Sequence, residues 1–597
     1  MREGSRALGL ALLLWAHAAG ANEPPPVTEI TPAVATPLGA GDSDEAVARE
    51  PGPLGYRVVQ GNLETSADGG LRFSAMNGTL SPSRGYYPVE VMLHNEGSTP
   101  RVVRVSVEAR GSGGGLTTRQ VEVGARQRVP VSLPVSVQAS NVMVRADSPG
   151  LNLRPISFYA VQTTRPVLVL GSERAFQEGT RLPERERDPD FSVRFLSAEE
   201  APRELAPYVG HVMVVVAGEV AALPAETWSA LEAYASTGGL LVLLRPPRDV
   251  LQRLPLLPEP GEGYFRYGFG QVRLCGDPAD CGTRLLSDVS LTDQDRTRAV
   301  LPAGSAPSWQ RRYALYNDTP PLLPGVQAPV GRFLLLITLF VLAVGPGGLL
   351  LARRKGPVAL LIAVPSVALA TCLGLVAWSV LVEGFSLHAA RQSLTWLDRE
   401  RDRAMTLGVS GYYANLAPDG VQVPALGALV SADVTWDQVE LEADWTQGMR
   451  VTGGFLSART YREWGELAAR PTRARLALRS DASGSRVQNA LGAPLADGFL
   501  FWKGTLWRLP ALAEGGEGAL SPVTGLEPRE AASHFLKVQG SVDQRRFGVA
   551  AWDAFGAALP EGGFIARLTG EGLGAVTPLP VKLYQGAHLV RGGVDAP

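Results

Sequence analysis

Two long apolar stretches dominate the hydrophobic pattern of the chain. Residues 333–352 and 357–382 contain no charged side chain, and each can cross ~30 Å of hydrocarbon as a helix of about 20 residues. Only Arg353-Arg354-Lys355-Gly356 separates them. The pattern predicts a hairpin of two transmembrane helices. Because positive residues favour the cytoplasmic side, Arg353, Arg354 and Lys355 are expected to determine the topology, with the turn 353–356 in the cytoplasm.

The two spans also carry residues that affect helix packing. Pro346 lacks a backbone N–H and is expected to kink the first span. Small residues four positions apart, such as Gly348 and Ala352 or Ala370 and Gly374, predict that the two helices pack closely. Transport paths usually need charged groups inside the membrane, so a pore or transporter role is not expected for this chain alone.

The region from residue 54 to 163 alternates between apolar and polar side chains. Alternation with a period of two residues is clear at 89–94 and 102–107, and turn-forming residues such as Asn95-Glu96-Gly97 separate the runs. Short strands with this spacing predict an antiparallel β-sandwich of immunoglobulin-like type.

Residues 164–330 have a different pattern. Short apolar runs occur in this region, at 166–170, 191–196, 211–216 and 240–244. Helical segments separate the later runs, and the clearest begins at Pro224 and ends before Gly238-Gly239. This alternation predicts an α/β domain in which crossover helices connect the strands of a parallel sheet.

Residues 384–597 become polar again and contain several strand-like segments. The pattern predicts a second β-rich domain of sandwich type. Within it, Tyr461, Trp464 and Leu467 are spaced by three residues, which predicts one helix over 458–469.

The first 53 residues have the features of a targeting segment and a linker. Arg2 and Arg6 precede an apolar run at 7–16, and Ala19-Gly20-Ala21 offers a small-residue cleavage site, so residues 1–21 are expected to be a signal peptide. Residues 22–53 lack periodicity and are expected to be a disordered linker. Export of the N-terminal part followed by two crossings would leave both soluble regions outside the cytoplasm, in the periplasm or outside the cell.

Composition narrows the possible chemistry. The 597 residues suffice for several domains, and 56 basic against 58 acidic residues leave a net charge of −2, so no nucleic-acid partner is expected. Cys275 and Cys281 bracket a polar turn and are expected to form a disulfide in an oxidising compartment. Neither Cys nor His supplies further ligands nearby, so no metal site and no cofactor are expected.

A resemblance to known proteins becomes visible in the α/β region. A helix with Trp228 and Leu231, then Gly238-Gly239 and the apolar strand 240–244, is similar to the class I glutamine-amidotransferase-like fold. More widely, the order of domains resembles uncharacterised bacterial membrane proteins, in which a sandwich, an amidotransferase-like domain, a membrane hairpin and a β-rich tail follow one another. The motifs that carry this resemblance are Tyr86-Tyr87-Pro88-Val89, His94-Asn95-Glu96-Gly97, Val344-Gly345-Pro346 and Asn489-Ala490-Leu491-Gly492.

The residues of an amidotransferase triad are not present. Such enzymes place a nucleophilic Cys on a sharp turn between a strand and a helix, and a later His activates it. After Leu244 the chain instead reads Arg245-Pro246-Pro247, and His211 precedes this turn. No catalytic, cofactor-binding or metal-binding residue is therefore predicted, and an enzyme is not favoured.

The sequence thus favours a non-catalytic, membrane-anchored scaffold or binding protein of a bacterial envelope, with a protein partner such as a transporter and a ligand that stays undetermined. Where the cell has two membranes, the bilayer is expected to be the inner one, since outer-membrane proteins cross with strands. The alternative is a membrane-tethered hydrolase with an unrecognised nucleophile in the α/β domain. A sensor is disfavoured because only about four residues would remain inside between the spans.

Overall fold

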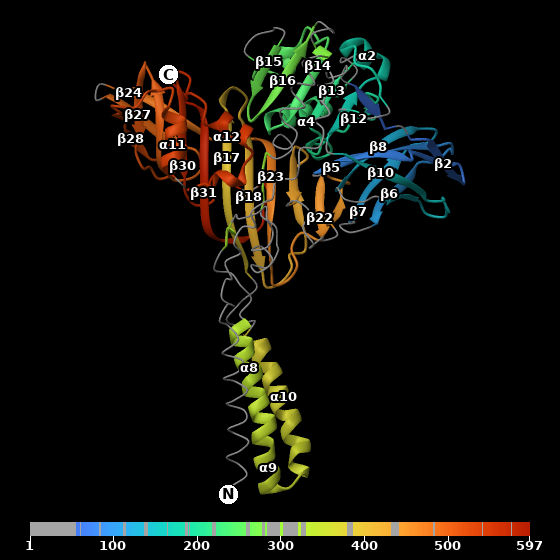
Figure 1. Ribbon diagram of the computed structural model, residues 1–597, viewed down its shortest axis with the longest axis vertical. Coiled ribbons are helices and arrows are strands. Elements are labelled where there is room, and N and C mark those ends of the chain that lie inside the picture. The colour runs from blue at the N-terminus through green and yellow to red at the C-terminus, as the bar shows by residue number, and fades with distance from the viewer. Residues whose placement is uncertain are drawn as a thin grey trace, which may run out of the picture. The chain divides into compact units, whose positions relative to one another are not determined.

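The computed structural model shows a multidomain, strand-rich chain with two long apolar helices (Figure 1). It describes residues 55–596 except 60, 83–84, 111–114, 137–140, 164, 186–188, 190, 218–222, 258–262, 277–280, 283–298, 303–319, 324–329, 379–385, 432–440, 482–483, 540 and 575. The signal peptide expected at 1–21 and the linker expected at 22–53 lie outside these residues. The described residues belong to one compact unit, Pro53–Pro597.

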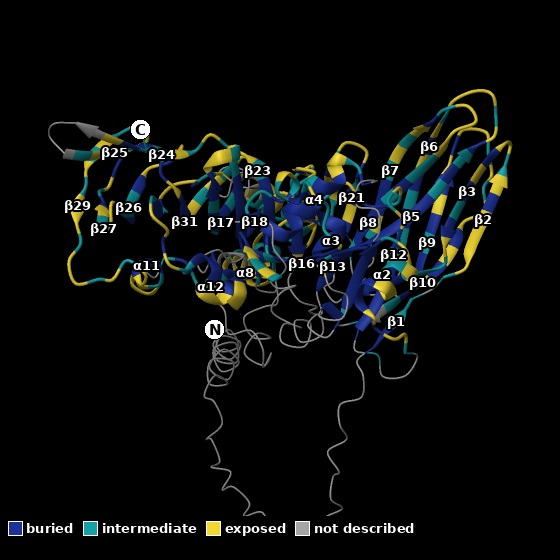
Figure 2. Cartoon of the chain, turned by 90° about the horizontal axis from the view of Figure 1, so that it is seen from above, coloured by how far each residue is buried: buried dark blue, intermediate teal, exposed yellow. Residues whose placement is uncertain are grey.

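The expected N-terminal β-sandwich is present. One layer is a four-stranded antiparallel sheet in the order β2-β3-β5-β8. Its strands are β2 (Leu63–Asp68), β3 (Leu71–Met76), β5 (Tyr86–Asn95) and β8 (Arg128–Ser136). The second layer is formed by β4 (Gly78–Pro82), β6 (Arg101–Arg110), β7 (Gly115–Val123), β9 (Asn141–Asp147) and β10 (Ile156–Thr163). Alternate side chains such as Val89, Val91 and Leu93 of β5 fill the core between the layers. Figure 2 shows that β5 is largely buried.

The second layer does not end at the expected domain boundary. It continues from β7 into β21 (Leu441–Asp444), β22 (Met449–Gly453) and β19 (Val421–Val423), which come from the far side of the hairpin in sequence. Strand β21 pairs with β7 in parallel. A Cβ atom on Gly115 would lie 2.4 Å from the Leu441 carbonyl oxygen, so this pairing requires glycine. The two soluble regions therefore share one sheet.

A third sheet contains the apolar runs of residues 164–330. Its order is β1-β12-β11-β13-β14-β16-β15, and all pairings are parallel except β15 with β16. The strands are β1 (Tyr56–Val58), β11 (Pro166–Leu170), β12 (Phe191–Leu196), β13 (Met213–Val216), β14 (Leu240–Leu244), β15 (Gly263–Tyr267) and β16 (Gly270–Cys275). The placement of Tyr56–Val58 in the sandwich was wrong, because this segment pairs with β12 at the edge of the parallel sheet.

Helices lie in the connections of this sheet. They are α2 (Glu173–Thr180), α3 (Ala206–Val209), α4 (Ala225–Ser236) and α5 (Val250–Arg253). Helix α4 follows Pro224, as expected, and the chain reverses at Gly238, whose φ of 119° favours glycine. Leu231 of α4 shares a core with Leu467 of the C-terminal half, whereas Phe176 of α2 lies in a separate core on the other side of the sheet.

A nine-stranded sheet forms most of the C-terminal region. Its order is β20-β23-β18-β17-β31-β30-β26-β27-β29. The strands are β17 (Leu387–Asp398), β18 (Arg403–Ala414), β20 (Gly427–Ser431), β23 (Thr460–Pro471), β26 (Leu495–Trp502), β27 (Thr505–Leu509), β29 (Ser521–Pro522), β30 (Gly563–Leu568) and β31 (Val581–Gly593). A three-stranded sheet of β24 (Arg475–Asp481), β25 (Gly484–Ala490) and β28 (Glu517–Ala519) completes the predicted second sandwich, whose short helices are α11 (Ala531–Gln539) and α12 (Val549–Phe555).

The helix expected over 458–469 is not present. These residues belong mainly to strand β23, which pairs with β18 on one side and β20 on the other. Because β23 lies between two strands and is buried on both faces, apolar residues occupy both faces and hide the alternation. The spacing of Tyr461, Trp464 and Leu467 was therefore misleading.

The two sandwiches repeat the same strand pairing. In chain order, β3, β5, β6, β7, β8, β9 and β10 correspond to β24, β25, β26, β27, β28, β30 and β31. In each set the first strand pairs with the second, the second with the fifth, the third with the fourth and the sixth, and the sixth with the seventh. All ten pairings are antiparallel.

A buried asparagine lies at the same position of both repeats. Asn95, near the end of β5, donates from Nδ2 to the carbonyl oxygens of Thr99, Val123 and Gly124 at 2.7, 3.1 and 3.1 Å. Its Oδ1 accepts the Gly97 N–H at 3.0 Å. These hydrogen bonds thus connect the β7–β8 turn to the end of β5.

Asn489 of β25 makes the corresponding set of bonds. Its Nδ2 donates to Ala493, Leu512 and Ala513 at 2.9, 3.3 and 3.1 Å, and its Oδ1 accepts from Leu491 N–H at 3.1 Å. Both asparagines are fully buried. The two asparagine motifs that carried the family resemblance therefore have a structural role in the turns.

The apolar hairpin consists of two helices with a tight turn. The first comprises α8 (Val330–Leu342), a π-helical turn (Ala343–Gly347) and α9 (Gly348–Lys355), and the second is α10 (Val358–Trp378). The π-helical turn contains Pro346, whose missing N–H disturbs the regular bonding. Arg353, Arg354 and Lys355 are the last turn of α9 rather than part of the loop, which is reduced to Gly356 and Pro357.

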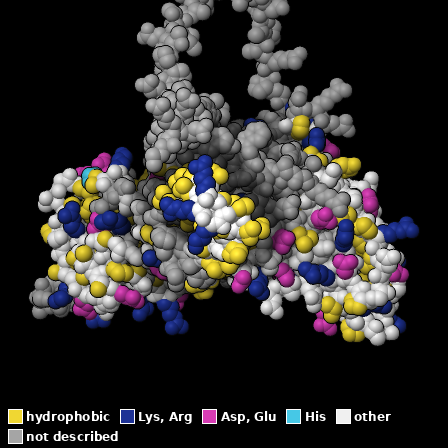
Figure 3. All heavy atoms as spheres, turned by 90° about the horizontal axis from the view of Figure 1, so that it is seen from below, with side chains coloured by type: hydrophobic (Ala, Val, Ile, Leu, Met, Phe, Trp, Pro, Cys, Tyr) yellow, Lys and Arg dark blue, Asp and Glu magenta, His cyan; other side chains and the backbone are white. Residues whose placement is uncertain are grey.

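The side chains of the hairpin face outward. In the apolar 18-residue window of each candidate span, Leu334–Lys355 and Val358–Leu375, 6% and 0% of the residues are buried. A core helix of a soluble protein would be mostly covered, so this exposure favours lipid as the surrounding medium. Figure 3 shows apolar side chains around the hairpin and Lys and Arg at its tip. A Cβ atom on Gly348 would lie 3.2 Å from a Leu360 methyl, whereas a Cβ atom on Gly374 would meet open space, so only part of the small-residue pattern serves hairpin packing.

We expect Asn489→Ala to destabilise the C-terminal sandwich by about 2–4 kcal/mol, because three carbonyl groups lose their donor. Hydrogen exchange of the full chain in detergent should show faster exchange in the peptide that covers 510–516. Asn62→Ala, at an exposed position, is the matched control. Unchanged protection of the turn in the Asn489 variant would contradict the assigned role.

Candidate functional site

The carboxyl edge of the parallel sheet is where an amidotransferase would hold its nucleophile. Arg245 follows β14 there, with a φ of 55° that is uncommon for a residue with a side chain. Its N–H donates to the Cys275 carbonyl at 2.9 Å. His211 precedes β13, so it lies at the opposite, amino edge of these parallel strands. The two residues cannot act together in one catalytic site.

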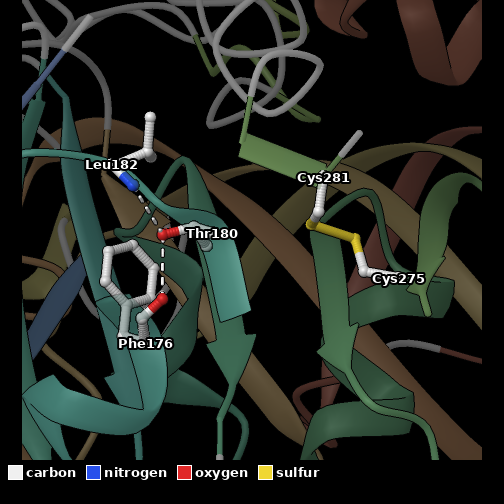
Figure 4. The surroundings of a disulfide bond; sticks show 5 residues. All are labelled: Phe176, Thr180, Leu182, Cys275 and Cys281. Atoms are coloured by element: carbon white, nitrogen blue, oxygen red, sulfur yellow. Dashed lines mark hydrogen bonds between the residues drawn. A yellow bond between two sulfur atoms is a disulfide. The ribbon is translucent and has the colours of Figure 1, made fainter. Parts of the chain in front are cut away.

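The disulfide lies beside this carboxyl edge. Cys275 at the end of β16 is bonded to Cys281, and the residues between them, 277–280, are outside the described residues. A Cβ atom on Gly282 would lie 1.9 Å from the Thr180 carbonyl oxygen, so the bridged segment packs closely against the end of α2. Thr180 Oγ1 donates to the Phe176 carbonyl at 2.8 Å (Figure 4). The bridge therefore supports the packing of α2.

A buried ion pair connects the hairpin entrance to the nine-stranded sheet. Arg546 and Glu463 form an ion pair with side chains only 1% and 0% exposed, and Arg546 also donates to the Pro320 carbonyl. The Leu322 N–H donates to Tyr461 Oη at 2.8 Å and to Glu463 Oε1 at 3.2 Å. We name Pro320, Leu322, Tyr461, Glu463 and Arg546 the anchor cluster.

The anchor cluster and β17 attach both ends of the hairpin to the same sheet. Leu322 precedes α8 by a short connection and is bound to β23 through the anchor cluster. On the other side of the hairpin, β17 begins at Leu387, shortly after α10, and pairs with β18, which in turn pairs with β23. Residues on both sides of the two spans thus belong to one folded body.

A second polar cluster contains a serine–histidine pair. Ser393 Oγ lies 2.7 Å from His588 Nδ1 across β17 and β31. Burial lowers the pKa of His588 to about 4, and the charge of Arg391 acts in the same direction. Because a general base works best with a pKa near the operating pH, this imidazole is a weak base. Ser393 and His588 are cross-strand neighbours, and among the described residues His588 Nε2 has no hydrogen-bond partner, so the pair forms a contact between β17 and β31.

A polar cavity of about 110 Å³ lies between the outer face of the four-stranded sheet and residues 199–204. Glu90 of β5 borders it and forms an ion pair with Arg194 of β12, which also donates to the Gly78 carbonyl at 2.7 Å. Burial raises the pKa of Glu90, and Arg194 lowers it to a smaller extent. Within the described residues, Glu90 Oε1 and Ser132 Oγ are buried without a hydrogen-bond partner. Two polar atoms at one cavity are thus left for a ligand or water.

Sequence reasoning did not identify the buried charges. Glu90 stands between Val89 and Val91 in an alternating strand, where a solvent-facing position is the ordinary interpretation. Its partner Arg194 is 104 residues away, and Arg546 and Glu463 are 83 residues apart. A local pattern carries no signal for such pairs.

Comparisons with known proteins add little. No family model matches the chain, and no curated protein does. A cycloisomaltooligosaccharide glucanotransferase of Paenibacillus sp. is 11% identical over 32% of this chain and 28% of its own, with a TM-score of 0.13. An Amycolatopsis orientalis exo-chitosanase is 10% identical over 31% of this chain and 22% of its own, with a TM-score of 0.11. A fragment of Escherichia coli alpha-2-macroglobulin is 12% identical over 72% of this chain and 96% of its own, with a TM-score of 0.12. These scores support no conclusion about fold or function.

We expect Arg546→Gln to destabilise the chain by about 3–5 kcal/mol, because Glu463 would stay buried without its counter-charge. Arg545→Gln is the matched control, since Arg545 is 57% exposed and pairs with Asp543 at the surface. That change should cost about 1 kcal/mol or less. Thermal unfolding of both full-length variants in detergent measures the difference. Equal shifts in Tm would show that the anchor cluster is not the stronger contact.

Two buried histidines predict a loss of stability in acid. Burial lowers the pKa of His211 from 6.5 to about 4, and the same holds for His588. In the unfolded chain each histidine binds a proton near pH 6.5, whereas in the folded chain it binds one only near pH 4. The free energy of unfolding is therefore highest above pH 6.5 and decreases as the pH falls towards 4. The loss reaches up to about 3 kcal/mol for each histidine. His211→Leu should reduce this slope of Tm against pH, and His534→Gln, an exposed control, should not. An unchanged slope in the His211 variant would refute the assignment.

Proposed function

We propose that the chain is a non-catalytic scaffold or binding protein of a bacterial envelope, anchored by the hairpin in the cytoplasmic membrane with both soluble regions outside the cytoplasm. The observation that carries this proposal is the continuity of the folded body. The parallel pairing of β7 with β21 joins strands on opposite sides of the hairpin in sequence. Two regions that share a sheet must lie on the same side of a membrane.

The direction of insertion rests on the charges at the tip. Arg353, Arg354 and Lys355 end the first helix, and the positive-inside rule assigns such a tip to the cytoplasm. A disulfide between Cys275 and Cys281 accords with an oxidising compartment for the soluble body. The bilayer is then the first partner, and a second envelope protein such as a transporter is the proposed second.

The proposal treats the parallel sheet as an amidotransferase-like domain that serves binding. Arg245 occupies the turn after β14, and its N–H donates to the Cys275 carbonyl at 2.9 Å. At this edge the described residues bring one hydroxyl and one carboxylate together, because Ser197 Oγ donates to Glu200 Oε2 at 2.7 Å. The same carboxylate oxygen accepts the Ser197 N–H at 3.0 Å, so the contact closes a local turn after β12, and the proposal gives it a structural role. The Ser393–His588 pair lies outside the α/β domain and has a weak base.

Reporter fusions test the proposed topology. Alkaline phosphatase fused after residue 597 should be active, whereas a reporter inserted at Gly356 should be active only if it is a type that works in the cytoplasm. The two fusions control each other, since both use the same chain. A cytoplasmic location of residue 597 would overturn the proposal.

Co-purification tests the scaffold role. A tagged chain extracted from membranes in mild detergent should retain a partner in a fixed ratio, measured by mass spectrometry against membranes that contain the untagged chain. Repeated isolation of the chain alone, after chemical cross-linking as well as without it, would count against a scaffold.

A further inference from the structure

The polar cavity between the four-stranded sheet and residues 199–204 is a candidate binding site that the scaffold proposal does not use. Glu90 and Ser132 are cross-strand neighbours on β5 and β8, so their side chains project from the same face of the sheet. Glu90 is 8% exposed, and both Glu90 Oε1 and Ser132 Oγ are buried without a partner in the described part of the chain. A buried carboxylate oxygen without a hydrogen-bond donor is energetically unfavourable, so a ligand that supplies a donor would be stabilised there.

The charges around the cavity determine the sign of the ligand. Four glutamates and two arginines border it. Glu204 is paired with Arg119 at 2.5 Å, whereas Glu200 accepts the neutral Ser197 N–H and hydroxyl, at 3.0 and 2.7 Å, and has no ion pair among the described residues. Arg194, behind Glu90, compensates one carboxylate, so an excess of negative charge remains. The site therefore favours a cation over an anion.

The apolar side chains at the rim of the cavity indicate what kind of group carries the charge of the ligand. Leu63 and Met76, which pair across β2 and β3, are 64% and 37% exposed, and Met92 of β5, opposite Ser74, also lines the cavity. An apolar rim over an acidic floor fits an alkyl chain that ends in a charged donor. The cavity of about 110 Å³ has room for three or four waters at ~30 Å³ each, or for about five non-hydrogen atoms of a ligand.

We propose that this cavity binds an organic cation, an alkylguanidinium group, which donates to Glu90 Oε1 and Ser132 Oγ. The group can come from an Arg side chain of a partner protein or from a free small molecule. The partner form of this inference rests on the proposed scaffold function, and the free form does not. Residues 197–204 are fixed by the Leu205 N–H bond to the Ala425 carbonyl at 2.9 Å, so the C-terminal half helps to hold one wall of the site.

Calorimetric titration of the full chain in lipid nanodiscs tests the proposal. The probes are N-acetyl-arginine methylamide and methylguanidinium, each compared with its neutral isostere, N-acetyl-citrulline methylamide and methylurea, at constant ionic strength. At least one cationic probe should bind about tenfold more tightly than its isostere, as expected for charge-assisted bonds. Binding of methylguanidinium alone identifies a free cation as the source, and binding of the arginine derivative as well identifies a side chain. Equal affinity of each cation and its isostere overturns the proposal.

Two variants locate the binding. Glu90→Gln should weaken it about tenfold, with the exposed Glu122→Gln as the control. Because Glu90→Gln also removes the partner of Arg194, Met92→Trp provides a second variant that fills the cavity and keeps the acid, with Val102→Trp as its control at a 47% exposed strand position. Retention of binding by both cavity variants overturns the site. Since the probes need no partner protein, this result is independent of the co-purification experiment.

Discussion

The pairing of β7 with β21 is the constraint on which the rest of the structure depends. It joins strands that are separated in sequence by the whole membrane hairpin and makes one sheet from both soluble regions. Trp445, just beyond β21, extends the contact. Its backbone N–H donates to the Thr118 carbonyl at 2.7 Å, and its backbone carbonyl accepts from Arg119 Nε at 3.1 Å. The hairpin is therefore an insertion within a folded body and not a linker between independent domains.

Buried ion pairs determine how the α/β region and the C-terminal half pack against each other. Glu232 of α4 is bound by Arg401 at 3.3 Å and by Arg403, both from the C-terminal half, and accepts the Tyr267 hydroxyl at 2.9 Å. Replacing such groups with apolar residues often leaves stability unchanged or raises it, so their contribution is better sought in specificity. A guanidinium that must find one carboxylate discriminates against shifted packing of two largely apolar surfaces. The same argument applies to the anchor cluster around Arg546.

The features that were predicted correctly are those that depend on the local order of apolar and polar residues. Strands 166–170, 191–196 and 240–244 were placed at their observed bounds, because short apolar runs between turn residues describe buried parallel strands well. The helix at 458–469 failed because β23 is interior to a sheet and its central residues are buried on both faces, Glu463 and Glu466 included. The pairing of β1 with β12 and every buried ion pair depend on residues far apart in the chain, and no period reports them. The polar cavity was missed for this reason.

The long-range pairing also orders the assembly of the protein. The sandwich core and the core around Phe176 contain residues of the N-terminal half alone, so both can form before the hairpin is inserted. The core that joins α4 to the nine-stranded sheet cannot, because Leu467 and its neighbours follow the second span. Until they arrive, the edge of β7 and the apolar face of α4 are uncovered, which is the usual condition for edge-to-edge aggregation. Formation of the β7–β21 pair therefore covers this edge of the first half, and the entropy cost of closing the segment between the two strands grows only slowly with its length.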